Sequence, residues 1–142
     1  MKGKIPRNPQ LNVFRIPLVN IINMEHELVI LAQKIDWEKV EKEFSVYYPE
    51  LGRPAVPIRK MVGSMLLKQM YNLGDETFVE RWIENPYWQY FCGEVYFQYD
   101  KPYDPSDFVH FRKRIGEEGA QKILKLSISL FESKEVHEKE IL

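Results

Sequence analysis

The sequence predicts an all-α protein: a single compact bundle of about seven short helices with helix-turn-helix-like elements, preceded by an extended N-terminal arm. Apolar residues recur every three or four positions through most of the chain. Proline, glycine and capping residues divide this pattern into short segments. The chain is 44% hydrophobic and 13% aromatic, which is enough apolar material to form a core.

Residues 1–20 are predicted to form the arm, because they contain three prolines and no helical period: Pro6, Pro9 and Pro17. We expect the arm to pack along the domain through Phe14 and Leu18. The helical domain is predicted to span residues 21–132, and residues 133–142 are predicted to form a C-terminal tail.

Two helices are expected in the first half of the domain. Asn23 is the predicted N-cap of the first, whose apolar residues run from Leu28 to Ile35. Asp36 is the predicted start of the second, with Trp37, Val40 and Phe44 on its inner face. The end of this helix is indicated by Pro49, Gly52 and Pro54.

A longer helix is expected to begin at Pro57 and to end at Gly74, a predicted C′ residue. Asp75 is the predicted cap of the next helix, and Asn85-Pro86 begins another that ends at Gly93. In residues 94–105, Val95, Phe97 and Tyr99 alternate with polar positions. A short strand and a shielding loop therefore remain equally open there.

Two further helices complete the prediction. One is capped by Asp104 or Ser106 and runs to Ile115, and the last begins at about Glu117. The last helix is expected to bury the stripe Ala120, Ile123, Leu124, Ile128 and Phe131. The positions expected to lie off this stripe, and to be exposed, are Leu126, Leu130 and Val136.

Several classes of protein are excluded by composition. No apolar run approaches the ~20 residues of a membrane span. The N-terminus does not resemble a secretory signal. Cys92 is the single cysteine, so no internal disulfide can form, which fits a reducing cytoplasm. There is no phosphate-binding glycine motif.

No metal or other cofactor is predicted for this chain. The aspartates Asp100, Asp104 and Asp107 could form a cation cluster, but each is better explained as a turn former or N-cap next to proline. The three histidines are too scattered for a zinc site.

The net charge of −1 conceals two basic segments. Residues 53–81 hold five basic and three acidic residues, a local charge of +2, and residues 106–126 have the same balance. The first segment yields a candidate DNA-contact patch on the long helix: Arg53, Arg59, Lys60 and Lys68. Basic side chains near a helix start can bind a DNA phosphate together with the free backbone N–H groups of the helix. An ordinary solvated helix face is the competing interpretation.

The helix from Asp107 to Ile115 yields the second candidate patch. At 100° per residue, Phe108, Phe111 and Ile115 share one face. The opposite face carries basic residues, with Arg112 at the apolar edge; the candidates are His110, Arg112, Lys113 and Arg114. An aromatic inner face with cations outside is typical of helices that contact DNA, although a simple amphipathic helix would show the same spacing.

Three long segments carry a family resemblance: HELVILAQKIDW, GRPAVPIRKMVGSMLLKQMYNLGDETFVERWIENPYWQYFCG and DPSDFVHFRKRIGEEG. In this order they resemble the N-terminal helical domain of DDE-type transposases from bacterial insertion sequences, the InsH-like group. The resemblance implies a domain that binds double-stranded DNA at the terminal inverted repeats of the element, in the cytoplasm at the nucleoid.

In complete members of that group, an RNase H-like domain follows and holds Mg²⁺ with three acidic residues. None of those carboxylates can be placed on a residue here, so the chain is predicted not to be an enzyme on its own. The alternatives are a fragment that pairs with itself or with intact transposase as an inhibitor, and a non-functional remnant.

Overall fold

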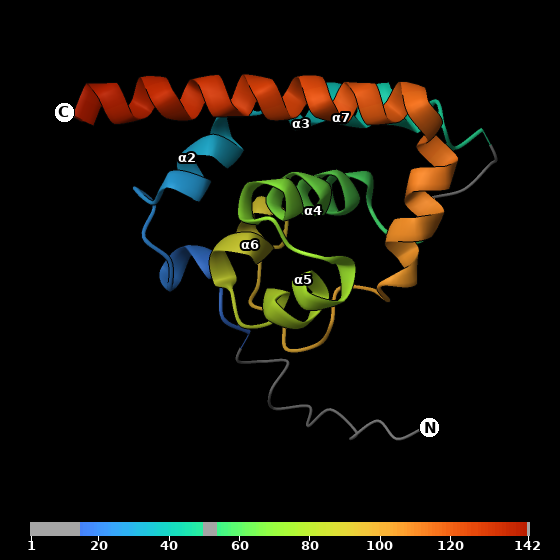
Figure 1. Cartoon of the computed structure of the whole chain (residues 1–142). Helices are drawn as coiled ribbons and strands as arrows, with labels where there is room; N and C mark the ends of the chain where they lie inside the picture. The colour runs from blue at the N-terminus through green and yellow to red at the C-terminus, as the bar shows by residue number, and fades with distance from the viewer. Residues whose placement is uncertain (1–14, 50–53, 142) are drawn as a thin grey trace.

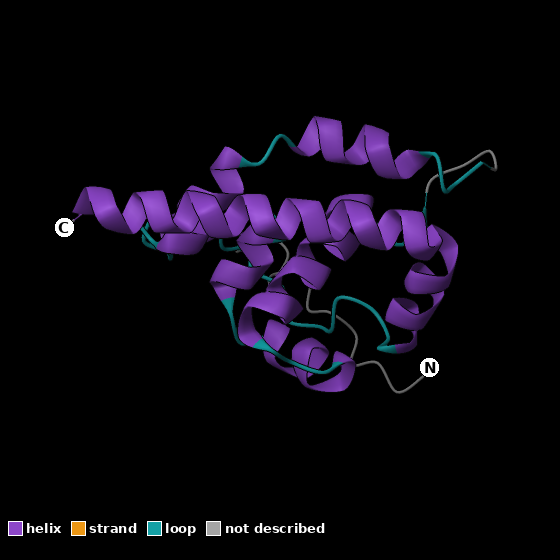
Figure 2. Ribbon diagram, turned by 45° about the horizontal axis from the view of Figure 1, so that its top comes forward, coloured by secondary structure: helices purple, strands orange, loops and turns teal. Residues whose placement is uncertain are grey.

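The computed structural model describes residues 15–49 and 54–141, with side chains to Ser133. The all-α prediction is confirmed: this part of the chain forms six α-helices and one 3-10 turn and contains no strand (Figure 2). In chain order the elements are η1 (Leu18–Asn20), α2 (Glu27–Lys34), α3 (Trp37–Ser45), α4 (Ile58–Tyr71), α5 (Asp75–Trp82), α6 (Pro86–Phe91) and α7 (Ser106–Ile141).

Helix α4 lies at the centre of the molecule and contacts α3, α6 and α7 (Figure 1). Its sequence explains this position, because apolar and small residues occupy more than one side of the helix. The buried residues of α4 are Ile58, Met61, Val62, Gly63, Ser64, Leu66 and Leu67. Of the remaining helices, α2 packs against α6 and α7, and α5 packs against α6.

Two predicted helix starts are confirmed. The Asp36 carboxylate accepts a hydrogen bond from the backbone N–H of Lys39 (3.2 Å) at the start of α3. The Asn85 side chain accepts from two backbone N–H groups at the start of α6, with Pro86 at the first helical position. Both caps satisfy donors that have no partner within the helix.

The N-cap predicted at Asn23 is wrong. Helix α2 begins at Glu27 and is capped by His26, whose Nδ1 accepts from the backbone N–H of Leu28 (3.0 Å). Asn23 instead closes a turn by accepting from the N–H of Glu25 (2.9 Å). The His26 ring also stacks on the Tyr87 ring of α6 at 3.9 Å, which joins the start of α2 to that helix.

The end predicted for α4 at Gly74 is also wrong. Asn72 takes the left-handed conformation (φ 52°) that ends the helix, and Gly74 precedes α5 as its N-cap. Asparagine tolerates this conformation better than most residues, so no glycine is needed. Asp75 enters the first turn of α5, where its carboxylate is free to pair with cations.

The segment 94–105 is a loop with one β-bridge, between Pro17 and Tyr96. The backbone N–H of Leu18 donates to the Val95 carbonyl (2.9 Å), and that of Phe97 donates to the Ile16 carbonyl (2.8 Å). Leu18 is fully buried, which confirms its predicted packing, whereas Phe14 lies outside the described residues. Backbone hydrogen bonds therefore join the end of the N-terminal arm to the loop 94–105.

Helix α7 turns a corner at Gly116, whose backbone is non-helical (φ 61°, ψ −162°). The corner divides α7 into residues 106–115, called here the first arm of α7, and residues 117–141, called the second arm of α7 (Figure 1). These two parts correspond to the two predicted helices. At Gly119, an added Cβ would overlap the side chain of Ile115 across the corner. Both glycines are therefore needed for the bend.

Replacing Gly116 with Ala should lower the free energy of unfolding by about 1–2 kcal/mol, because only glycine is comfortable at these angles. The space around Gly116 is open, so the loss would come from the backbone alone. Chemical denaturation would measure it. Gly74→Ser is the control, since Gly74 has ordinary angles and open space and serine is a favoured N-cap residue, so stability should not fall. Equal stability of both variants would contradict the strain argument.

The second arm buries a different face from the one predicted. Ile123 and Leu130 are buried and Leu126 packs against the core, while Leu124, Ile128 and Phe131 are exposed. Two contacts, one with α3 and one with the residues just after it, accompany this rotation. Tyr47 Oη donates to Glu118 (2.8 Å), and Lys122 Nζ donates to the Glu43 carbonyl (3.0 Å). The side chain of Val136 lies outside the described part.

Candidate nucleic-acid interface

The first arm of α7 is held by its aromatic face, as predicted. Phe108, Phe111 and Ile115 are buried, and the Phe108 ring meets the rings of Phe78 (6.0 Å) and Tyr103 (5.2 Å) edge-on. Edge-to-face contacts of this kind fix a ring in one orientation. The helix therefore presents its opposite face to solvent in a defined way.

His110 and Lys113 are exposed on that opposite face. Neither forms a hydrogen bond or ion pair with another residue in the described part of the chain. An exposed lysine without a carboxylate partner can approach a phosphate at little cost in lost interactions. Among the seven candidates that the structure describes, these two side chains have the fewest contacts within the protein.

Arg112 and Lys68 share one carboxylate, that of Asp75. The Arg112 guanidinium donates to both Asp75 oxygens (3.2 and 2.9 Å), and Lys68 Nζ pairs with the same side chain. Lys68 Nζ also lies 4.2 Å from the centre of the Phe108 ring. The hydrogen bond from Arg112 is the main reason that the pKa of Asp75 falls from 3.8 to about 2.

Lys68, Asp75 and Arg112 together form a cluster, called here the Asp75 junction, which connects α4, α5 and α7. It also brings one residue from each predicted patch together. Two cations and one carboxylate leave the junction with a net charge of +1. It can raise the local positive potential while it stabilises the fold.

Arg114 is exposed but contacts two residues that follow α3. It donates to the Tyr47 carbonyl (3.2 Å), and its guanidinium lies 4.5 Å from the Tyr48 ring centre. Burial raises the pKa of Tyr48, and the charge of Arg114 partly opposes this. Arg114 therefore has an intramolecular role besides any contact with DNA.

Arg59 is packed between helices. Its guanidinium lies 4.5 Å from the Trp37 ring centre and donates to the carbonyls of Phe91 and Tyr90 at 3.4 Å. Burial lowers the pKa of this group. Gly93 (φ 97°) makes room for it, because an added Cβ would come within 2.9 Å of Arg59 Cδ.

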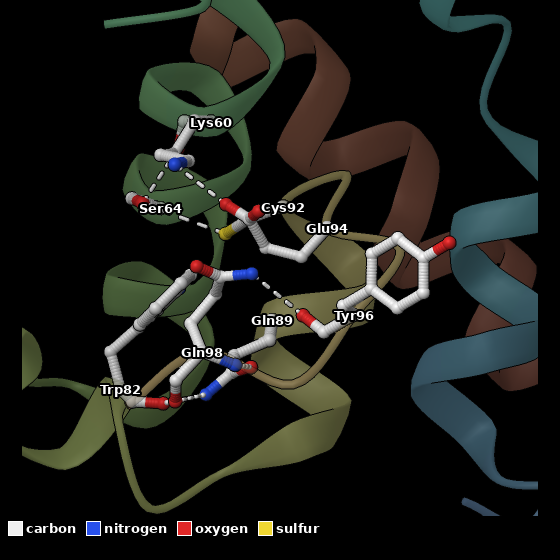
Figure 3. A network of polar contacts seen from close by, with 8 residues as sticks. All are labelled: Lys60, Ser64, Trp82, Gln89, Cys92, Glu94, Tyr96 and Gln98. Carbon is white, nitrogen blue, oxygen red and sulfur yellow. Dashed lines mark hydrogen bonds and ion pairs between the residues drawn. The ribbon is translucent and has the colours of Figure 1, made fainter. Parts of the chain in front are cut away.

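Lys60 is also engaged inside the fold, as Figure 3 shows. It forms an ion pair with Glu94 at 2.6 Å, with both side chains largely buried, and lies 5.7 Å from the Trp82 ring centre. Ser64, one turn further along α4, is buried and donates to the Lys60 carbonyl (2.6 Å). Lys60 is therefore engaged inside the fold and does not lie on an open outer face of α4.

The same region holds two other buried polar groups (Figure 3). Cys92 lies 3.6 Å from Ser64 Oγ, and burial raises the pKa of its thiol to about 11. Gln89 is fully buried; its Oε1 accepts from the backbone N–H of Gln98 (2.7 Å) and its amide nitrogen donates to the Gln98 carbonyl (3.1 Å). These bonds connect α6 to the loop that follows it.

The acidic partners are the residues that sequence reasoning missed. Glu94 follows α6 and gives no sequence signal that it would reach Lys60. Asp75 could have been suspected, since the two helices that carry Lys68 and Asp75 are joined by a short turn. Arg53 lies outside the described residues.

No group of three or more His, Cys, Asp or Glu side chains in the described part could hold a metal ion. Among the same residues, no helix has the length and apolar character to cross a membrane.

Comparisons with known proteins identify the family. Residues 17–114 match a family described as Transposase domain (DUF772). The chain is 44% identical over 128 residues to an uncharacterized protein, ORF8 in the nfe locus of Rhizobium meliloti, across 90% of this chain. It spans 62% of the length of that relative. No solved structure matches. With more than half of its length matched, the chain belongs to the DUF772 transposase-domain family.

Proposed function

We propose that this chain is a DNA-binding part of an insertion-sequence transposase of the InsH-like group, and that it recognises the terminal inverted repeats of its element. The exposed basic face of the first arm of α7, with His110 and Lys113, carries the proposal. Membership of a transposase-domain family supports it. The proposed role is recognition, and no residue of this chain is assigned to strand cleavage.

The geometry suits contact with a phosphate backbone. A helix held by buried aromatic rings keeps its outer side chains in register, so a few cations can meet successive phosphates. Lys113 supplies an uncompensated charge, and Arg112 and Arg114 flank it in sequence. The Asp75 junction, which includes Arg112 of the same helix, adds its net positive charge to the attraction.

We expect Lys113→Ala to weaken binding to the inverted-repeat duplex. It should also reduce the slope of log K against log salt by about 0.9, the value for one lost phosphate contact. Fluorescence anisotropy across a salt series would measure both. Lys39→Ala is the matched control, because Lys39 is an exposed lysine on α3. An unchanged slope for Lys113→Ala would contradict the proposed contact. A scrambled duplex of equal length separates recognition of the repeats from general attraction to DNA.

Lys60→Ala should behave differently from Lys113→Ala. It leaves the Glu94 carboxylate without its ion-pair partner in a largely buried position, so the free energy of unfolding should fall by about 1–2 kcal/mol. DNA affinity, measured well below the melting temperature, should change little. Thermal unfolding and anisotropy on one preparation would give both values. A loss of affinity with unchanged stability would place Lys60 at the DNA instead.

Binding is proposed to need no metal, since the expected contacts come from side chains and helix termini. The same titration in the presence of a chelator checks this. The proposed cellular site is the bacterial nucleoid.

A further inference from the structure

The second arm of α7 carries an apolar stripe on the side that faces away from the body. The side chains of Leu124, Ile128 and Phe131 are 49%, 52% and 64% exposed. At 100° per residue they fall within an arc of about 60°. Ile123 and Leu130 are buried and lie about 110–130° around the helix from the centre of this arc.

The spacing of this stripe, four residues and then three, is the spacing of the d, a and d positions in a helix that pairs with another helix. Exposed apolar side chains that are gathered on one face mark an interaction surface. Because the body packs on the opposite side of the arm, a partner helix can lie along the stripe without meeting it.

Among the side chains that the structure describes, the two edges of the stripe differ in charge. On one edge lie Lys125 and Glu132, both exposed and two helical turns apart. On the other edge lies Ser127, which is uncharged. A partner that fits this surface must therefore match a lysine and a glutamate along a single edge.

We propose that the partner is a second copy of this chain, with the two second arms packed antiparallel across a two-fold axis near Ile128. In such a pair, each edge faces the same edge of the other copy. Lys125 then lies beside Glu132 of the second copy, and the symmetry repeats this contact. Leu124, Ile128 and Phe131 are covered by the same residues of the second copy.

A parallel pair does not make this match. There, the edge with Lys125 and Glu132 faces the opposite edge of the partner, where Ser127 lies. The apolar stripe would still be covered, but the two charges would have no partner among the described residues. Charge complementarity thus selects the antiparallel arrangement.

The first test is sedimentation velocity of the full chain over a concentration series. We expect the native chain to dimerise, and the double variant Leu124→Ser, Ile128→Ser to raise the dimer dissociation constant at least about tenfold. Both side chains are exposed, so the monomer of the double variant should have the same melting temperature as the native monomer. Ser129→Ala, exposed on the same arm but off the stripe, should dimerise normally. A native chain that stays monomeric, or a variant that dimerises equally well, would overturn the proposal.

The second test uses K125E and E132K to establish the orientation. K125E makes the charged edge wholly acidic and E132K makes it wholly basic, so each variant alone should dimerise more weakly than the native chain. Mixed in equal amounts, they should form a heterodimer, because the two edges are then complementary. Native mass spectrometry distinguishes it from the homodimers. Failure of the mixture to prefer the heterodimer would exclude the antiparallel pair.

Discussion

Phe108→Ala is expected to lower the free energy of unfolding by about 3–4 kcal/mol, one of the two largest effects we expect from a single substitution. Phe108 is fully buried and meets rings from two other parts of the chain, as well as the ammonium group of Lys68. The variant leaves a ring-sized cavity and removes a cation–π contact beside the Asp75 junction. Equilibrium denaturation by urea, followed by tryptophan fluorescence, would measure the loss.

Val109→Ala is the matched control for this substitution. Val109 is the next residue along the same helix but lies 40% exposed, so its loss should stay below about 0.5 kcal/mol. The Phe108 variant should also bind DNA more weakly at temperatures where it remains folded, since the first arm is then less firmly held. A Phe108 variant as stable as the Val109 variant would show that this ring does not hold the arm.

Asp75→Asn should cost about 2–3 kcal/mol, because it removes the one carboxylate that two cations share. Lys68 is left largely buried beside an aromatic ring without a counter-charge, which is the more costly half of the change. Arg112→Ala keeps the pair of Lys68 with Asp75 and is expected to cost less. An Asp75 variant no less stable than the Arg112 variant would argue against the junction as a structural element.

The same aspartate should give the native protein a distinctive acid response. Its pKa in the folded state is about 2, below the ordinary value of 3.8. A carboxyl whose pKa is lowered by folding adds stability above its unfolded pKa and loses it as pH falls towards its folded pKa. We therefore expect native stability to decline from about pH 4 towards pH 2 more steeply than that of Asp75→Asn. Parallel profiles would contradict this.

The ends of helices were predictable where only one residue nearby was suited to cap the helix. Asp36 and Asn85 each precede a clear apolar period, and both form the expected caps. The prediction failed where neighbours could serve the same role. His26 replaces Asn23 as the cap of α2, and its ring stacks on Tyr87 of another helix. Asn72 replaces Gly74 at the end of α4, because asparagine also tolerates the left-handed conformation.

The candidate site was predictable only in its local part. The two faces of the first arm follow from helical spacing, and the structure confirms them. The surroundings of Lys60 and Lys68 depend on Glu94 and Asp75, which lie on other elements and leave no periodic trace. In the second arm, Ile123 and Leu124 are adjacent apolar residues, so spacing alone could not choose which of them faces the core.

The position of α7 determines when, during synthesis of the chain, the earlier helices can be covered. This last helix covers both α2 and the central α4, and Leu18 near the start bonds to Val95 far downstream. Chains are made from the N-terminus, and contacts distant in sequence form late. The apolar faces of the early helices that α7 covers therefore stay exposed to solvent until α7 has been synthesised.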